Sequence, residues 1–281
     1  MNGFIDIQFK DLDVLREMVD IAKGFGSQYC SFSISQSRIE IIGSDLSSIS
    51  SVYVYVSYEI SRNVSSSDVP LQMRSFSIPH SIQNTDVVCF KVNILNLAHA
   101  IALMRKPNMM NIHMKLYESG ERWILLFQHE DFTGLSYEKE IFVLPENFLR
   151  SEPKIKPFNV VMELPDFYKV HCVGASMKTF NERIKISANS QGELKLETGH
   201  AMFNMITCFN NCINHMDLVE VLEYDNSKFV TINVDSTHFV KFFSVVTEDF
   251  YVNFKIVDNY ALLFEAEKDD LKVKLILPAK L

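Results

Sequence analysis

The sequence predicts an α+β protein built from two tandem domains of similar design. Three observations lead to this prediction: a proline-rich stretch in mid-chain, segments that recur on either side of it, and the same order of strands and helices in both halves. The mid-chain stretch, LPENFLRSEPKIKP at 144–157, suits neither a helix nor a central strand, because proline lacks a backbone N–H. We therefore expect a first domain at 1–144, a connector at 145–157 and a second domain at 158–281.

The two halves share four pairs of segments in the same order, which indicates a tandem duplication. The pairs are FSISQSRIEII (32–42) with ISANSQGELKLE (186–197), VNILNLAHAI (92–101) with INVDSTHFVKF (232–242), ERWILLFQHED (121–131) with DNYALLFEAEKDD (258–270), and EIFVLP (140–145) with VKLILP (273–278).

Composition fits two globular cores. The chain has 281 residues, is 47% hydrophobic and contains 22 Phe, enough apolar material for two domains. We expect neither a secretory signal nor a spanning helix, because no apolar run approaches the required length. Five cysteines without framework spacing suit a reducing compartment. A net charge of -8 argues against a surface coated throughout with nucleic acid, although it leaves room for a basic stripe.

In the first half, period-two alternation and capping signals predict strands, two helices and a partly irregular crossover. A stripe of apolar residues at helical spacing, Leu12, Leu15, Val19 and Ala22, marks the first helix. The expected strands are 4–8, 29–35, 38–43, 51–58 and 87–92, with three more ending at 144; the helices are 10–23 and 93–105, and the partly irregular crossover is 60–79.

The second half repeats this order. Asp235 or Ser236 is suited to capping its second helix, and Gln191-Gly192 to a hairpin turn. The expected strands are 158–163, 183–188, 193–197, 201–209 and 229–234, with three more ending at 278; the helices are 166–179 and 235–246, and 210–226 is a crossover.

Enzymatic alternatives have weaker support. Cys208, Cys212 and His215 are spaced too loosely for a zinc site and lack a second ligand pair. The acids from Glu265 to Asp270 resemble a magnesium cluster but suit a solvated hairpin better. Tyr53, Tyr55 and Trp123 lack the interleaved basic residues of a single-strand binder. We expect no metal, no cofactor and no catalytic residue, while a thiol- or zinc-dependent enzyme remains the alternative outside the binding proteins.

The order of elements resembles that of the eukaryotic sliding DNA clamps, and in particular the Hus subunit (Hus-one) family of the heterotrimeric nine-one-one checkpoint clamp. The stretches that carry this resemblance are LPDFYKVHCVGASMKTF, ISANSQGELKLETG (186–199) and the C-terminal FEAEKDDLKVKLILPAKL. The homotrimeric replicative clamp is the alternative within the superfamily.

The resemblance implies a non-catalytic, nuclear subunit, with a cytoplasmic pool possible in principle. Two paralogous subunits would complete a ring with sheets outside and two helices per domain lining the hole. The ring would encircle double-stranded DNA without reading its sequence, after loading by a clamp-loader ATPase at damaged or primed sites. It would then scaffold repair and checkpoint proteins, with no role for a membrane.

The resemblance also implies three sets of site residues. Polar faces of the helices would meet DNA phosphates, edge strands at 136–144 and 201–209 would join neighbouring subunits, and the connector would dock partners. The DNA-facing residues would be Lys10, Arg16, Lys106, Lys169 and Lys241; the subunit-interface residues Tyr137, Ile141, Val143, Phe203, Met205 and Thr207; and the docking residues Phe148, Leu149 and Ile155. The first helix also has three acids, Asp13, Glu17 and Asp20, on its polar face, so the expected charge of that face is mixed.

Overall fold

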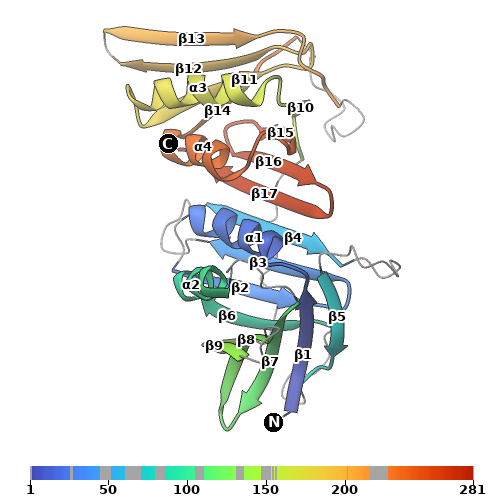
Figure 1. Ribbon diagram of the computed structural model, residues 1–281. Helices are drawn as coiled ribbons and strands as arrows, with labels where there is room; N and C mark the ends of the chain where they lie inside the picture. The colour runs from blue at the N-terminus through green and yellow to red at the C-terminus, as the bar shows by residue number, and fades with distance from the viewer. Residues whose placement is uncertain are drawn as a thin grey trace. The chain divides into compact units, whose positions relative to one another are not determined.

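The structure is a computed structural model of the 281-residue chain (Figure 1). It describes residues 2–25, 28–44, 52–60, 71–79, 86–104, 111–130, 136–146, 153, 155, 157–200, 202–215 and 227–280. None of the described helices combines the length and apolar character needed to cross a membrane.

The chain divides into two compact units. The first consists of Met1–Gly43 and Tyr55–Ser151, and the second of Ser44–Val54 and Glu152–Leu281. Among the described residues, each unit has two α-helices and antiparallel strands, so the α+β class predicted from the sequence is confirmed.

The first unit orders its strands β4-β3-β2-β6-β9-β8-β7-β1-β5. Its helices, α1 and α2, contact each other, and α2 packs on β6, β8 and β9 (Figure 1). Its elements are β1 (Asn2–Phe9), α1 (Asp13–Gly24), β2 (Tyr29–Ile34), β3 (Arg38–Ser44), β4 (Tyr53–Glu59), β5 (Leu71–Phe76), β6 (Val88–Asn93), α2 (Ile94–Met104), β7 (Ile112–Ser119), β8 (Arg122–Glu130) and β9 (Ser136–Glu146).

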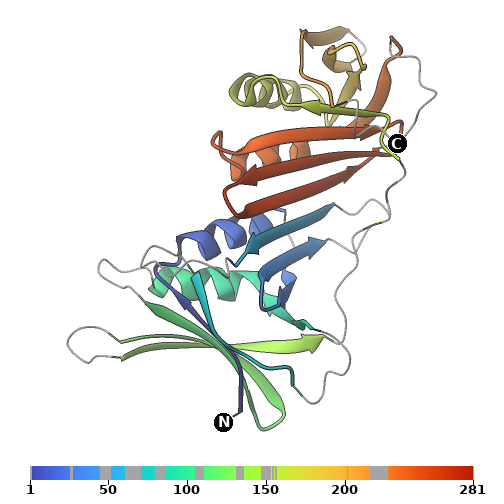
Figure 2. The ribbon, with the colours of Figure 1, turned by 90° about the vertical axis from the view of Figure 1, so that its right-hand side faces the viewer.

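The second unit has two four-stranded sheets, in the orders β10-β15-β16-β17 and β13-β12-β11-β14. Its helices α3 and α4 contact each other; α3 packs on β11 and β12, and α4 on β14 and β17 (Figures 1 and 2). Its elements are β10 (Val160–Glu163), α3 (Phe167–Lys178), β11 (Arg183–Ala188), β12 (Leu194–His200), β13 (Phe203–Phe209), β14 (Val230–Asp235), α4 (Ser236–Val245), β15 (Tyr251–Val257), β16 (Ala261–Lys268) and β17 (Leu271–Pro278).

Strand order shows the duplication directly. The run β1-β7-β8-β9 of the first unit corresponds to β10-β15-β16-β17 of the second, and β4-β3-β2-β6 corresponds to β13-β12-β11-β14. The described parts of the two units also differ. In the first, β6 and β9 pair through Lys91 and Leu144, which joins the two halves of the sheet. It also has an extra strand, β5, paired with β1.

The partly irregular crossover expected at 60–79 contains a strand that the sequence did not predict, the extra strand β5 at Leu71–Phe76. Leu71 is its one fully buried residue, since β5 lies at the end of the strand order with β1 as its neighbour. Its sequence, LQMRSF, consequently lacks the alternation that identifies a half-buried strand. The expected strand 201–209 begins in the structure at Phe203.

Burial follows the predicted patterns elsewhere. Leu12, just before α1, and Leu15, Val19 and Ala22 on α1 are all buried. In the second unit, the rings of Phe239, Phe242, Phe243 and Phe264 pack together, with Phe242 and Phe264 stacked at 4.3 Å between ring centroids. Aromatic rings contribute large buried areas and constrain packing geometry, so this cluster fixes α4 against the sheet that contains β16.

The second-unit helices begin at aspartates. Asp166 accepts a hydrogen bond from the backbone N–H of Lys169, and Asp235 accepts from Thr237 and His238. A carboxylate at this position satisfies backbone donors that have no partner within the helix and interacts favourably with the positive end of the helix dipole. The sequence prediction that Asp235 or Ser236 caps α4 is thus resolved in favour of Asp235.

Candidate nucleic-acid interface and subunit edges

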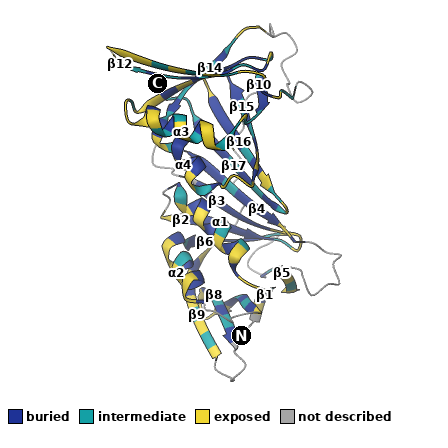
Figure 3. Ribbon diagram, turned by 45° about the horizontal axis from the view of Figure 1, so that its top comes forward, coloured by how far each residue is buried: buried dark blue, intermediate teal, exposed yellow. Residues whose placement is uncertain are grey.

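The helices of both units have one buried and one exposed face (Figure 3). The exposed faces are the candidates for contact with DNA, because phosphate contacts are made by accessible basic side chains. Of the five residues expected there, Lys10, Arg16, Lys169 and Lys241 are exposed, and Lys106 lies outside the described residues. Lys10 precedes α1, and the other three lie on helices.

The first-unit helices offer little positive charge. α1 contains two basic residues and three acidic ones, and the guanidinium of Arg16 is already 3.3 Å from the carboxylate of Asp20. α2, with the sequence ILNLAHAIALM, contains no Lys, Arg, Asp or Glu. It exposes Leu95 and Leu103, which are 56% and 45% accessible. The face formed by these two helices is therefore neutral to acidic and partly apolar.

The second-unit helices are different. Lys169 and Lys178 on α3 and Lys241 on α4 are exposed, and neither helix contains an acidic residue. The ammonium of Lys169 lies 2.9 Å from the capping carboxylate of Asp166. Hydrogen bonds from Lys169 hold the pKa of Asp166 below its usual value. The described helices of the second unit are therefore net positive, whereas acids outnumber bases on α1 and α2 has neither, an asymmetry that the prediction from sequence did not contain.

The second unit presents β13 at the end of a strand order, with β12 as its neighbour. Of the three residues expected at this edge, Phe203 is exposed, and Met205 and Thr207 are partly buried. Sequence reasoning missed the apolar residues beside Phe203. Ile206 is exposed on the same strand, Met202 precedes it, and the ring of Phe180 lies 5.0 Å from that of Phe203.

In the first unit, β9 pairs with β8 along Ser136–Val143 and with β6 only at Leu144–Glu146. The side chains of Ile141 and Val143 are buried inside the unit, and Tyr137 is partly buried. Ile141 and Val143 could contribute only their backbone to a subunit contact. The exposed apolar side chains of β9 are instead Phe142 and Leu144.

The connector contributes one described docking candidate. Ile155 is partly buried, while Phe148 and Leu149 lie outside the described residues.

The cysteine and histidine residues considered for zinc have other neighbours. Cys208 is exposed on β13, Cys212 is buried with its thiol 3.8 Å from the carbonyl of Phe209, and His215 Nε2 lies 3.1 Å from Glu163. No three His, Cys, Asp or Glu side chains in the described part of the chain are placed to hold a metal ion together. Tyr53 and Trp123 are buried, and the hydroxyl of Tyr55 donates to Glu40, so these aromatics pack within the fold.

Comparison with known protein families and solved structures identifies the family and the fold. The family model of Hus1-like proteins matches residues 69–279. This chain belongs to the Hus1-like family. No protein with a curated description matches it by sequence.

Solved structures agree on the fold of this Hus1-like chain. Proliferating Cellular Nuclear Antigen from Entamoeba histolytica is 12% identical, with a TM-score of 0.71 and complete coverage of both chains. PCNA from Thermococcus kodakaraensis is also 12% identical, with a TM-score of 0.69 over 98% of this chain and all of that one. The fold is that of the sliding clamps, as the sequence predicted, and family and fold together support a sliding-clamp function.

Proposed function

We propose that this Hus1-like chain is a non-catalytic subunit of a heterotrimeric ring that encircles DNA and scaffolds damage-checkpoint signalling and repair. The ring would form with two paralogous clamp subunits, be loaded by a clamp-loader ATPase at damaged or primed sites, and act in the nucleus. Repair and checkpoint proteins would dock on the connector, where Ile155 is the described candidate and Phe148 and Leu149 are the others.

The observation that carries this proposal is the membership of 69–279 in the Hus1-like family on a clamp fold. Two structural features support it. β13 lies at the end of its strand order and has exposed apolar residues beside it, as a strand that pairs with another subunit requires. The lysines of α3 and α4 provide accessible positive charge for phosphate contacts that do not read sequence.

Native mass spectrometry tests the assembly. The 32.4 kDa chain is purified alone and then co-expressed with two clamp paralogues from the same organism. We expect a monomer alone and a one-to-one-to-one complex with both partners. A homotrimer from the chain alone would instead indicate a self-assembling clamp. A monomer in both samples would contradict the ring.

Topological retention tests the DNA function. The assembled complex is incubated with loader and ATP on a nicked circular plasmid, washed in high salt, and the plasmid is then linearised. High salt removes electrostatically bound protein, so a complex that survives the wash but leaves after linearisation must have encircled the DNA. Equal retention on the circular plasmid and on the linearised plasmid would contradict encirclement.

A further inference from the structure

A polar groove lies on the sheet β13-β12-β11-β14 of the second unit. It has a volume of about 480 Å³, and strands β11, β12, β13 and β14 all contribute to its lining. Arg183, Lys185 and His200 supply basic groups, while Phe203 and Asn204 connect it to the edge strand β13. The groove is therefore continuous with the edge proposed to meet a neighbouring subunit.

Gly199 gives the groove its depth. It pairs with Asn204 across β12 and β13, while Glu197 two residues earlier pairs with Lys185 on β11. Side chains two residues apart lie on the same face of a strand, so Lys185, Arg183, Glu197 and Gly199 share one face of the sheet. Because Gly199 has no side chain, that face is open beside Arg183. A Cβ at Gly199 would lie 3.1 Å from Asn204 Oδ1 and 3.4 Å from the carbonyl oxygen of Phe203. A larger side chain here would fill the hollow.

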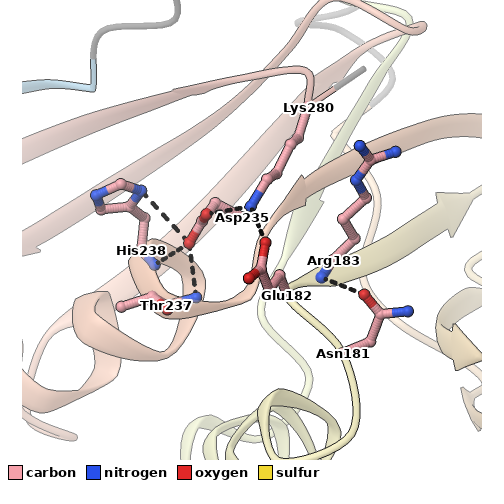
Figure 4. Close-up of polar contacts among 7 residues, drawn as sticks. All are labelled: Asn181, Glu182, Arg183, Asp235, Thr237, His238 and Lys280. Carbon is pink, nitrogen blue, oxygen red and sulfur yellow. Dashed lines mark hydrogen bonds and ion pairs between the residues drawn. The ribbon is translucent and has the colours of Figure 1, made fainter.

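Asp235 and Glu197, two acids on the strands that flank Arg183, already have partners. Asp235 is its partner in the β11–β14 register, yet its oxygens accept from Lys280 and from the first backbone N–H groups of α4 (Figure 4). Glu197 lies 3.1 Å from the ammonium of Lys185 and accepts from Asn204 at 3.3 Å.

The Arg183 guanidinium forms no hydrogen bond or ion pair with the described residues, and the same is true of the His200 ring. The one contact given for Arg183 in Figure 4 is made by its backbone N–H, which donates to Asn181. An arginine fork with its donors available at a groove matches a carboxylate, which it can bind through two parallel hydrogen bonds.

Beside the groove, Ile206 is exposed on the same face of β13 as Asn204, and Met202, just before β13, is 95% accessible. The rings of Phe203 and Phe180 lie together on the opposite face of this sheet. A surface with an arginine and adjacent exposed apolar side chains has the composition of a protein-binding site. The occupant should therefore bring both an acid and apolar groups.

We propose that this groove receives an acidic side chain from the neighbouring clamp subunit, and that Arg183 thereby selects which subunit binds at the β13 edge. The inference rests on the proposed ring. The strand that would meet β13 is the neighbour's counterpart of β9, and this chain's own β9 displays the matching chemistry. Glu138, Glu140 and Phe142 are exposed at alternate positions of β9, where Gln128 donates to Glu138 and the Tyr117 hydroxyl donates to Glu140. A strand with this pattern brings carboxylates together with an aromatic ring.

The first test measures ring stability. The co-expressed three-subunit complex is diluted, and its dissociation constant is measured by native mass spectrometry for the wild type and for Arg183→Glu. We expect at least a tenfold weaker ring for Arg183→Glu, because a charged group placed against a like charge loses the pair and adds repulsion. Gly199→Val should weaken it as well by filling the groove.

Lys195→Glu is the matched control. Lys195 lies on β12 with its ammonium over the ring of Phe229, and it does not line the groove. The substitution Lys195→Glu nevertheless changes the charge by the same amount as Arg183→Glu. Equal weakening by Lys195→Glu, or an unchanged ring with Arg183→Glu, would overturn the inference while leaving the ring intact. Failure of the wild-type chain to form any ring would overturn the proposed function first, so the two failures are distinguishable.

The second test identifies the partner residue. In the Arg183→Lys variant, a carbodiimide can join the new amine to a carboxylate in direct contact. We expect a crosslink from position 183 to an acidic residue in the last strand of the neighbour's first domain. A crosslink to a second copy of this chain, or only to residues outside that strand, would contradict the assignment.

Discussion

The ammonium of Lys280 lies 2.7 Å from Asp235 Oδ2, which connects the second-last residue of the chain to the cap of α4 (Figure 4). The other oxygen of Asp235 accepts from the backbone N–H groups of Thr237 and His238. Lys280 also reaches Glu182, 3.4 Å away, and its backbone N–H donates to Asn233. The C-terminal residues therefore stabilise the start of α4, a helix proposed to meet DNA.

Replacing Asp235 by alanine should lower the free energy of unfolding by about 1 kcal/mol, the usual cost of losing a side-chain cap. Urea titration followed by circular dichroism measures this. Asp235→Asn is the matched control, since asparagine still caps but carries no charge for Lys280. If Asp235→Asn destabilised the protein as much as Asp235→Ala, the ion pair rather than the cap would be the main contribution.

Stability should fall in acid. Partial burial acts to raise the pKa of Asp235, but hydrogen bonds from Lys280 and His238 outweigh it and hold that pKa below its ordinary value. Hydrogen bonding to Lys185 similarly lowers the pKa of Glu197. A lowered pKa in the folded state contributes stability that is complete above the unfolded value, about 4, and is lost as the pH falls through the folded value.

Thermal melts between pH 7 and pH 3 check this expectation. The wild type should keep its melting temperature down to about pH 4–5 and lose it below. Asp235→Asn should show a shallower loss, because it cannot take up the proton. A variant curve parallel to that of the wild type would show that other carboxylates govern the acid transition.

Gly174→Ala should destabilise the protein although alanine favours helices. Gly174 is buried on α3, and a Cβ there would lie 2.8 Å from Phe239 Cε1. Phe239 cannot easily move, because its ring packs against Phe243 and Phe264. Overpacking of this kind typically costs about 1–3 kcal/mol.

Denaturant unfolding compares Gly174→Ala with Ser176→Ala, an exposed substitution on the same helix. The control should change stability by less than about 0.5 kcal/mol. Stabilisation by Gly174→Ala would mean that α3 and α4 adjust their packing with little cost.

The apolar periodicity of the sequence predicts most helices and strands, but it does not predict whether some strand side chains point into the core or out to solvent. α1 was predictable because Leu15 and Val19 recur on one helical face. On β9 the run from Ile141 to Leu144 is wholly apolar, so alternation cannot reveal that Phe142 and Leu144 are outside. Whether a side chain there is inside or outside follows from the pairing with β8, which is a long-range property of the sheet.

The groove was beyond sequence analysis for a similar reason. Arg183 and Gly199 are 16 positions apart, and they share a groove only because β11 and β12 pair in one particular register. The duplication, by contrast, was visible because repeated strands retain similar apolar patterns even where their side chains differ.

Thiol alkylation should distinguish two classes of cysteine. Burial raises the pKa of Cys30 to about 12 and that of Cys89 to about 11, so at pH 8 both stay protonated as well as inaccessible. Cys172 and Cys208 are exposed. Because the thiolate is the reactive form, iodoacetamide should modify those two in the native protein.

Intact mass and peptide mapping follow the reaction, with a guanidinium-denatured sample as the control in which all five react. Burial also raises the pKa of Cys212, which should therefore react late. Rapid modification of Cys212 together with Cys208 would show that the segment around them opens readily in solution.

Removing the second-unit lysines should weaken duplex binding. In Lys169→Ala/Lys178→Ala/Lys241→Ala, up to three phosphate contacts are lost, and each contributes about 0.9 to the slope of log affinity against log salt concentration. Fluorescence anisotropy of the full chain with a labelled duplex at several salt concentrations should show lower affinity and a slope reduced by about 2–3. A triple variant with the same charge change on the strands, Lys195→Ala/Lys272→Ala/Lys274→Ala, is the control.

The first unit should respond in the opposite direction. Its helix α1 has three acids and α2 has no charge, so Asp13→Asn/Glu17→Gln should raise duplex affinity if this face also meets DNA, because like charge repels phosphate. Because the described helices of each unit are substituted separately, the two sets of variants report on the two units separately.

The strand variant Lys195→Ala/Lys272→Ala/Lys274→Ala decides between the two explanations of the lysine result. If it loses as much affinity as the variant of α3 and α4, the binding depends on net charge, which would contradict a phosphate-contacting surface on α3 and α4.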